Sequence, residues 1–76
     1  MATGQVQTML EQAFPGGSVE VVDRTGGGDH FHVTVASPSF AGLSLVEQHR
    51  LVNRAVAPLI DDGTIHELRI TTKGDP

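Results

Sequence analysis

The sequence predicts an α+β domain with the element order helix, strand, strand, helix, short helix, strand. Three observations predict it. Apolar residues recur at three- and four-residue spacing around 6–14 and 45–56, as they do in amphipathic helices. Residues 18–23, 30–35 and 65–72 alternate or are rich in β-branched side chains, as strands are. Glycine and proline clusters separate these segments, and 76 residues suit a single domain over 1–76.

The first half of the chain is expected to form a helix and a hairpin. The apolar residues of the helix are Val6, Met9, Leu10, Ala13 and Phe14, and Pro15-Gly16-Gly17 ends it. Two strands follow, over 18–23 and from His30 onward, joined by a glycine-rich connection at 25–29. A short joint of this kind predicts an antiparallel hairpin with a flexible loop.

The second helix has a clear start and end. Ser44 with Glu47 three residues later fits a capping box, in which each residue satisfies a backbone N–H of the new helix. Its expected apolar face comprises Leu45, Val46, Leu51, Val52, Ala55 and Val56. Pro58 lacks an N–H and restricts Ala57, so the helix should end near Ala57, with a short turn or helix over 58–62.

The final strand, 65–72, places His66, Leu68 and Ile70 on one face. A three-stranded sheet with the helices on one face is the simplest arrangement that buries all the apolar stripes. A hairpin between the first two strands excludes a Rossmann unit, whose strands are joined by helical crossovers.

Composition narrows the classes of function. The chain has no cysteine, so a thiolate metal site needs a partner's ligands. Its net charge of −4 opposes the counterion release that drives most nucleic-acid binding. The first fifteen residues lack the basic and apolar stretches of a signal peptide, and no apolar run is long enough to cross a bilayer. We therefore expect a cytoplasmic protein without membrane contact, while an organelle stays open because a removed transit peptide leaves no trace.

The four histidines, His30, His32, His49 and His66, are the candidate metal ligands besides carboxylates. Strand alternation places His66 on the same face as core residues, whereas His30 lies on the polar face of its strand. Alternation alone therefore does not bring the two histidines together. They can meet only if both lie at the ends of their strands. His49 has Arg50 and Arg54 beside it on the helix, and positive charge disfavours cation binding, so a structural or partner-facing role is expected for it.

Four segments together resemble the BolA family in composition, order and spacing. They are Gly28-Asp29-His30-Phe31, Ser37-x-x-Phe40-x-Gly42-x-Ser44, Gln48-His49-Arg50-Leu51-Val52-Asn53 and Ile65-His66-x-Leu68-x-Ile70-x-Thr72. The resemblance implies an αββααβ fold similar to the class II KH domain. It also implies pairing with a monothiol glutaredoxin, in heterodimers that are apo or bridged by a two-iron two-sulfur cluster.

The resemblance further implies roles for individual residues. His66 is a cluster ligand, and the second comes from the loop between the first two strands, where His30 matches best and His32 and Asp29 are the alternatives. A glutaredoxin cysteine and a thiol such as glutathione, bound through the partner, supply the rest. The implied role is that of a non-enzymatic accessory factor in iron–sulfur delivery or iron regulation. Two departures from the pattern are Glu67, where the family commonly has a small residue, and Pro76, where many members continue into a tail.

The sequence gives less support to two other classes of function, a nucleic-acid-binding module and an enzyme. Arg50, Asn53 and Arg54, with Lys73, form a potential basic patch, which is expected to face the partner or, in a KH-like regulator, nucleic acid. KH domains clamp the backbone with a GxxG loop, which the 57–63 stretch lacks, and the three phenylalanines leave no stacking platform. An enzyme is disfavoured because the chain has no nucleophile or phosphate-loop motif.

Overall fold

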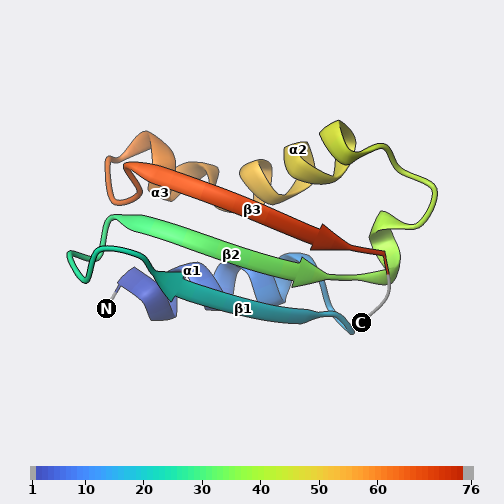
Figure 1. Cartoon of the computed structure of the whole chain (residues 1–76), viewed down its shortest axis with the longest axis horizontal. Helices are drawn as coiled ribbons and strands as arrows, with labels where there is room; N and C mark the ends of the chain where they lie inside the picture. The colour runs from blue at the N-terminus through green and yellow to red at the C-terminus, as the bar shows by residue number, and fades with distance from the viewer. Residues whose placement is uncertain (1, 75–76) are drawn as a thin grey trace.

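The computed structural model describes residues 2–74; Met1, Asp75 and Pro76 of the predicted domain lie outside the described residues. The elements are α1 (Ala2–Ala13), β1 (Ser18–Asp23), β2 (His30–Ala36), a 3₁₀ helix η1 (Pro38–Phe40), α2 (Leu45–Ala55), α3 (Ala57–Asp61) and β3 (Glu67–Lys73), as Figure 1 shows. The predicted element order is confirmed, with η1 added after β2. Within residues 2–74, no helix has the length and apolar character needed to span a membrane.

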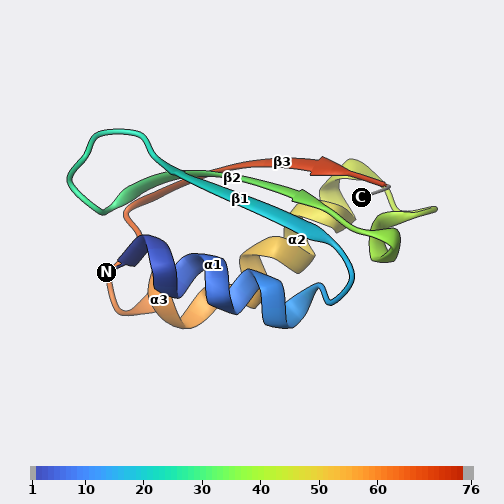
Figure 2. The same ribbon diagram turned by 90° about the horizontal axis from the view of Figure 1, so that it is seen from below.

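The three strands form one mixed sheet in the order β1-β2-β3. β1 and β2 pair antiparallel, as predicted for the hairpin, whereas β2 and β3 pair parallel. The parallel pair is possible because α2 and α3 carry the chain back to the starting end of β2. Figure 2 shows all three helices on the same face of the sheet, which confirms the predicted layers.

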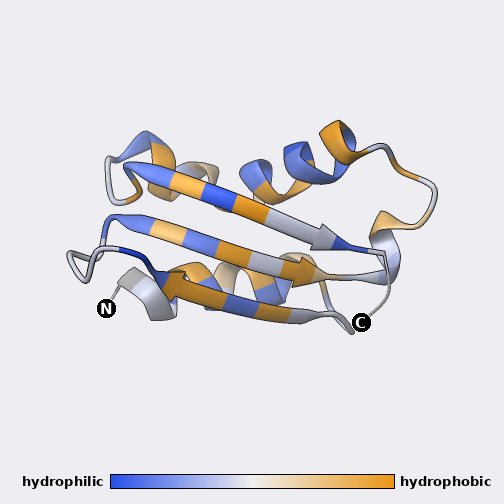
Figure 3. Cartoon of the chain, viewed as in Figure 1, coloured by the Kyte–Doolittle hydropathy of each residue, from blue (hydrophilic) through white to orange (hydrophobic). Residues whose placement is uncertain are grey.

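The core lies between the sheet and these helices. Phe31, Val33 and Val35 of β2 are fully buried, because alternate residues of a strand face the same side. The other core residues are Val6, Leu10, Phe14, Phe40, Val52, Val56, Leu59 and Ile65. The rings of Phe14 and Phe40 pack with their centroids 5.1 Å apart. Figure 3 shows apolar and polar residues alternating along β2, and the polar residues of this strand are only partly buried, so its helix-free side is polar.

The predicted apolar face of α2 is wrong at its start. Leu45 and Val46 are 62% and 60% exposed, because the sheet-facing position in this half of the helix belongs to Gln48. Its amide donates to the Leu43 carbonyl at 3.0 Å, and its Oε1 contacts the Thr72 hydroxyl of β3. Ala13 of the first predicted helix is likewise exposed. The capping box of α2 is confirmed in both of its hydrogen bonds.

One predicted boundary is confirmed and one shifts. The helix breaks near Ala57 as predicted, since α2 ends at Ala55 and α3 begins at Ala57. Pro58 lies inside the first turn of α3, a position that proline favours because no N–H is needed there. β3 begins at Glu67 rather than at residue 65. Ile65 is buried, and its N–H donates to the Leu59 carbonyl, so the chain turns through His66 before the strand begins.

Candidate functional site

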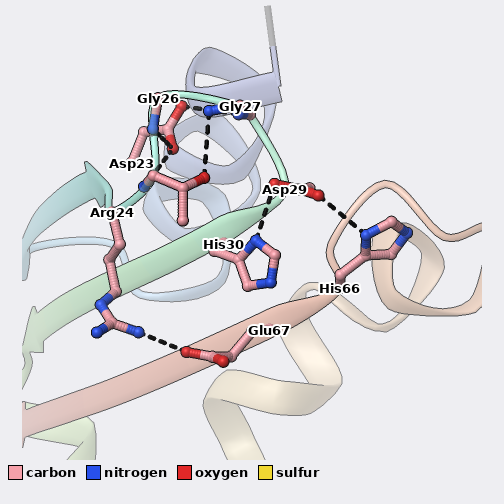
Figure 4. A network of polar contacts seen from close by, with 10 residues as sticks. Asp23, Arg24, Gly26, Gly27, Asp29, His30, His66 and Glu67 are labelled. Atoms are coloured by element: carbon pink, nitrogen blue, oxygen red, sulfur yellow. Dashed lines mark hydrogen bonds and ion pairs between the residues drawn. The ribbon is translucent and has the colours of Figure 1, made fainter.

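The loop between β1 and β2, residues 24–29, takes its shape from the Asp23 carboxylate. Oδ1 accepts the N–H groups of Thr25 and Gly26 at 3.3 and 3.0 Å, and Oδ2 accepts that of Gly28 at 2.9 Å (Figure 4). Gly26 and Gly28 both have φ near +77°, a backbone conformation that favours glycine. The triple glycine therefore adopts a specific turn that delivers Asp29 to the start of β2.

The backbone joins three segments at this point. The Asp29 carbonyl accepts the N–H of His66 at 2.8 Å and that of Glu67 at 3.2 Å, and the His30 carbonyl accepts the N–H of Arg24 at 2.8 Å. The β1–β2 and β2–β3 pairings thus meet next to His30. His30 is the first residue of β2, and His66 directly precedes β3. Both histidines therefore lie at strand ends, which is the condition for their meeting that strand alternation in the sequence sets.

The side chain of Asp29 bridges the two imidazoles. Oδ1 lies 2.9 Å from His30 Nδ1, and Oδ2 lies 3.0 Å from His66 Nδ1 (Figure 4). The ring centroids are 6.3 Å apart, with their planes at 75°. We call these three residues the histidine cluster. Each ring meets the carboxylate through Nδ1, so Nε2 is the nitrogen that does not face it.

The histidine cluster is accessible to solvent, and its hydrogen bonds favour the ionised form of Asp29. The His66 side chain is 62% exposed and that of His30 is 34% exposed. The hydrogen bond from His30, with the bond from His66 and the attraction of both rings, holds the pKa of Asp29 below its ordinary value despite some desolvation. The carboxylate is therefore ionised at neutral pH, and two imidazoles can be reached from solvent.

The donor set suits a shared metal centre. Neutral imidazole is a good iron ligand, and iron–sulfur centres with two histidines on one iron are an established type. Among residues 2–74 no group of three or more His, Cys, Asp or Glu side chains is placed to hold a metal ion. Binding of an iron by these two imidazoles, with other ligands from a partner, stays a prediction.

The carboxylate of Glu67, the residue after His66, contacts arginines and not an imidazole. Glu67 Oε1 forms an ion pair with Arg24 and lies 3.6 Å from Arg69 Nε (Figure 4). Glu67 is the position at which the sequence departs from the BolA pattern. Glu67 is paired with these arginines, and the imidazole of His66 contacts Asp29 instead.

The other predicted site residues lie outside the histidine cluster. His32, an alternative second ligand, has its Nε2 2.9 Å from the Thr71 hydroxyl on the helix-free face of the sheet. His49 lies on α2, where its carbonyl accepts the amide of Asn53 at 3.1 Å.

The candidate partner residues are also apart from the cluster. Arg50, Asn53 and Arg54 are exposed on α2, which lies along the half of β3 farther from the histidines (Figures 1 and 2). The two arginines line an open pocket with Leu43, Glu47 and Leu51. The structure therefore presents two separate candidate regions, the histidine cluster and this basic stretch of α2.

Sequence reasoning missed the bridging role of Asp29, which it weighed only as a ligand. The available signal was the placement of Asp29 directly before the first histidine at the end of a glycine loop. The contact with His66 arises from the parallel pairing of β2 and β3 and has no local trace in the sequence.

The fold and site together define a small α+β domain that carries an accessible, carboxylate-linked pair of histidines at one end of its sheet. A sequence model described as BolA-like protein matches residues 9–75, so the chain belongs to the BolA-like protein family. This confirms the resemblance found in the sequence.

Individual relatives agree with this assignment. BolA-like protein 3 of Saccharomyces cerevisiae is 39% identical over 74 residues, which cover 96% of this chain and 58% of the yeast protein. BolA1 of Arabidopsis thaliana matches in structure with a TM-score of 0.86 and 26% identity, covering 96% of this chain and 90% of that one. The BolA domain of SufE1 from the same plant gives a TM-score of 0.84 and 29% identity, covering 93% and 88%.

Proposed function

We propose that this protein is a non-enzymatic accessory factor that pairs with a monothiol glutaredoxin and shares a two-iron two-sulfur cluster with it, in the cytoplasm. The observation that carries the proposal is the histidine cluster, in which one carboxylate holds two accessible imidazoles at the starts of adjacent strands. Membership of the BolA-like family supports it, because the resemblance implies this partner and this cluster.

The ligands divide between the two proteins according to their chemistry. This chain has no cysteine, so its share is the imidazoles of His66 and His30. A glutaredoxin cysteine and glutathione held by the partner supply thiolates, the usual ligands of iron–sulfur clusters. When bound, the cluster supplies iron and sulfide for transfer, or a signal of iron status. His66 is the more exposed of the two histidines and is the one a docking partner reaches most readily.

The basic stretch of α2 serves the partner in this proposal. Arg50 and Arg54 line an open pocket that also has apolar lining, and Asn53 is exposed next to them. Arginine is enriched in protein interfaces because its planar guanidinium forms several directed hydrogen bonds. This region lies away from the histidines, so loss of partner affinity and loss of a ligand are separable by mutation.

The exposed arginines also favour a second candidate, a KH-like nucleic-acid-binding regulator. The net charge of −4 opposes it. Titration of labelled RNA and DNA at low ionic strength decides the matter: binding that weakens with added salt and with the double charge reversal of Arg50 and Arg54 would favour this candidate over the first.

The test of the proposed function is an anaerobic titration of this protein into a monothiol glutaredoxin under cluster-reconstituting conditions. Visible absorption and circular dichroism report the environment of the cluster. We expect a new spectrum that saturates near one-to-one and is lost with His66→Ala. His32→Ala is the matched control, since it removes an imidazole outside the histidine cluster and should leave the spectrum unchanged. A His66→Ala complex with the wild-type spectrum and cluster lifetime would contradict the assignment.

A further inference from the structure

We infer that Asp29 is a positioning residue that fixes both imidazoles with the proton on Nδ1, so that each ring presents an unprotonated Nε2 for coordination. The inference rests on the proposed function for its metal. The positioning itself is a property of the free protein and is measurable without a partner.

The two contacts with Asp29 determine which nitrogen of each ring carries the proton. An ionised carboxylate carries no hydrogen and acts only as an acceptor. Contacts of 2.9 and 3.0 Å between its oxygens and Nδ1 therefore require a proton on Nδ1 of both His30 and His66. In a neutral imidazole the other nitrogen then has a free lone pair, and this is the form that binds a metal.

Asp29 is held firmly enough to orient two rings. Its carbonyl already accepts the N–H groups of His66 and Glu67, so the backbones of Asp29 and His66 are joined independently of their side chains. On the other side, the bond from Arg24 to the His30 carbonyl fixes the start of β2. The carboxylate thus projects from a junction of both strand pairings and reaches one ring on each side (Figure 4).

A carboxylate behind an imidazole changes how well that ring binds a metal. Carboxylates behind metal-binding histidines orient the ring and raise its basicity, and their loss commonly lowers metal affinity by 10- to 100-fold. Asp29 performs this task for two rings at once. A single substitution should therefore affect both imidazoles, although it removes no ligand.

The experiment measures imidazole tautomers in the free protein by long-range proton–nitrogen correlation NMR. It is done at mildly alkaline pH, because only the neutral imidazole ring has two tautomers. In the wild type we expect His30 and His66 to carry the proton on Nδ1. Asp29→Ala should abolish this preference in both rings.

Asp29→Asn makes the sharper test. The amide has one acceptor oxygen and one donor nitrogen, so it can accept from one ring only. We expect one histidine to keep the proton on Nδ1 and the other to move it to Nε2. Glu67→Gln is the matched control, because it removes the same charge beside His66 without touching an imidazole, and it should leave both tautomers unchanged.

Two results would overturn the inference: Nε2-protonated rings in the wild type, or Nδ1 protonation that survives Asp29→Ala. In the complex with glutaredoxin, Asp29→Ala should shorten the lifetime of the cluster about 10-fold, while Glu67→Gln should not. Failure of the proposed function is recognised separately, since it would appear as a cluster indifferent to His66→Ala while the NMR result on Asp29 stood.

Discussion

The two loops at the ends of β2 are held by different interactions, one by a buried aromatic side chain and the other by hydrogen bonds. The stretch 37–44, after the strand, is anchored in the core by Phe40, which is 1% exposed and packs on Phe14. Ser37 is fully buried there, and its hydroxyl accepts the N–H of Ser39. The loop 24–29, before the strand, has no residue in the core and is shaped by hydrogen bonds to the Asp23 carboxylate.

This difference separates the residues that stabilise the fold from those that form the candidate site. Burial of apolar surface is the main contribution to folding, whereas hydrogen bonds near the surface contribute about 1 kcal/mol each in net terms. A loop held by hydrogen bonds leaves its side chains accessible, as the histidine cluster requires. Substitutions after β2 should therefore change the global free energy of unfolding, and those before β2 should act locally.

The largest effect is expected from Phe40→Ala. Removal of a buried aromatic ring leaves a cavity and typically costs about 3–5 kcal/mol of unfolding free energy. Urea denaturation followed by circular dichroism measures the loss. Ser39→Ala, an exposed substitution in the same 3₁₀ helix, is the control and should cost much less. A loss below about 1 kcal/mol for Phe40→Ala would show that this end is not anchored by burial.

A smaller effect is expected from Ser44→Ala, which removes the cap of α2. The Ser44 hydroxyl accepts the Glu47 N–H at 3.2 Å, and loss of such a cap costs about 1 kcal/mol. Glu47→Gln retains a capping box and should cost only part of this in the same denaturation experiment. Equal losses for the two variants would mean that the charge of Glu47, rather than the hydroxyl, stabilises the helix.

Asp23→Ala should act mainly within its own loop. It removes the acceptor of three backbone N–H groups, but these groups can turn to water, so the global loss is expected to be about 1 kcal/mol or less. Hydrogen exchange should accelerate at Thr25, Gly26 and Gly28 and stay unchanged in 37–44. Glu20→Ala, on the exposed face of β1, supplies the reference. Exchange that rises uniformly across the chain would show that the loop and the core unfold together.

The smallest effect is a pH dependence at Asp62, in the turn that leads toward His66. Hydrogen bonds from Thr64 lower the pKa of Asp62, so the folded state favours the charged carboxylate. This stabilisation is present above the ordinary aspartate pKa and is lost as pH falls through the lowered one. The stability difference between wild type and Asp62→Asn should therefore shrink on acidification from neutral pH. Asp61→Asn removes the same charge one residue earlier and serves as the matched control for the loss of charge.

Local patterns predicted the elements well where one residue sets the structure. The alternation of Phe31, Val33 and Val35 predicted the buried face of β2, and the spacing of Ser44 and Glu47 predicted the start of α2. The prediction failed at the start of α2, where tertiary contacts place a polar side chain against the sheet and leave apolar ones exposed. The pattern assigned Leu45 and Val46 to the apolar face of α2 and Gln48 to the polar side, yet Gln48 faces the sheet, since its amide satisfies a loop carbonyl.

The candidate site was predictable in its residues but not in its geometry. The family resemblance pointed to His30 and His66, and their meeting depended on both lying at strand ends. Whether they do is decided by the register of the β2–β3 pair, which aligns His30 with Glu67 and so places His66 just before the ladder. Register is set by packing across the whole sheet and cannot be taken from either segment alone.

The parallel register of β2 and β3 also determines when the histidine cluster can form during synthesis of the chain. His30 belongs to the early hairpin, whose contacts are local, but His66 reaches it only when β3 docks beside β2. Non-local parallel pairing is slow to form compared with a hairpin. A nascent chain that has not yet produced β3 exposes a single imidazole next to Asp29, so it cannot present the histidine pair to a metal or a partner before the sheet is complete.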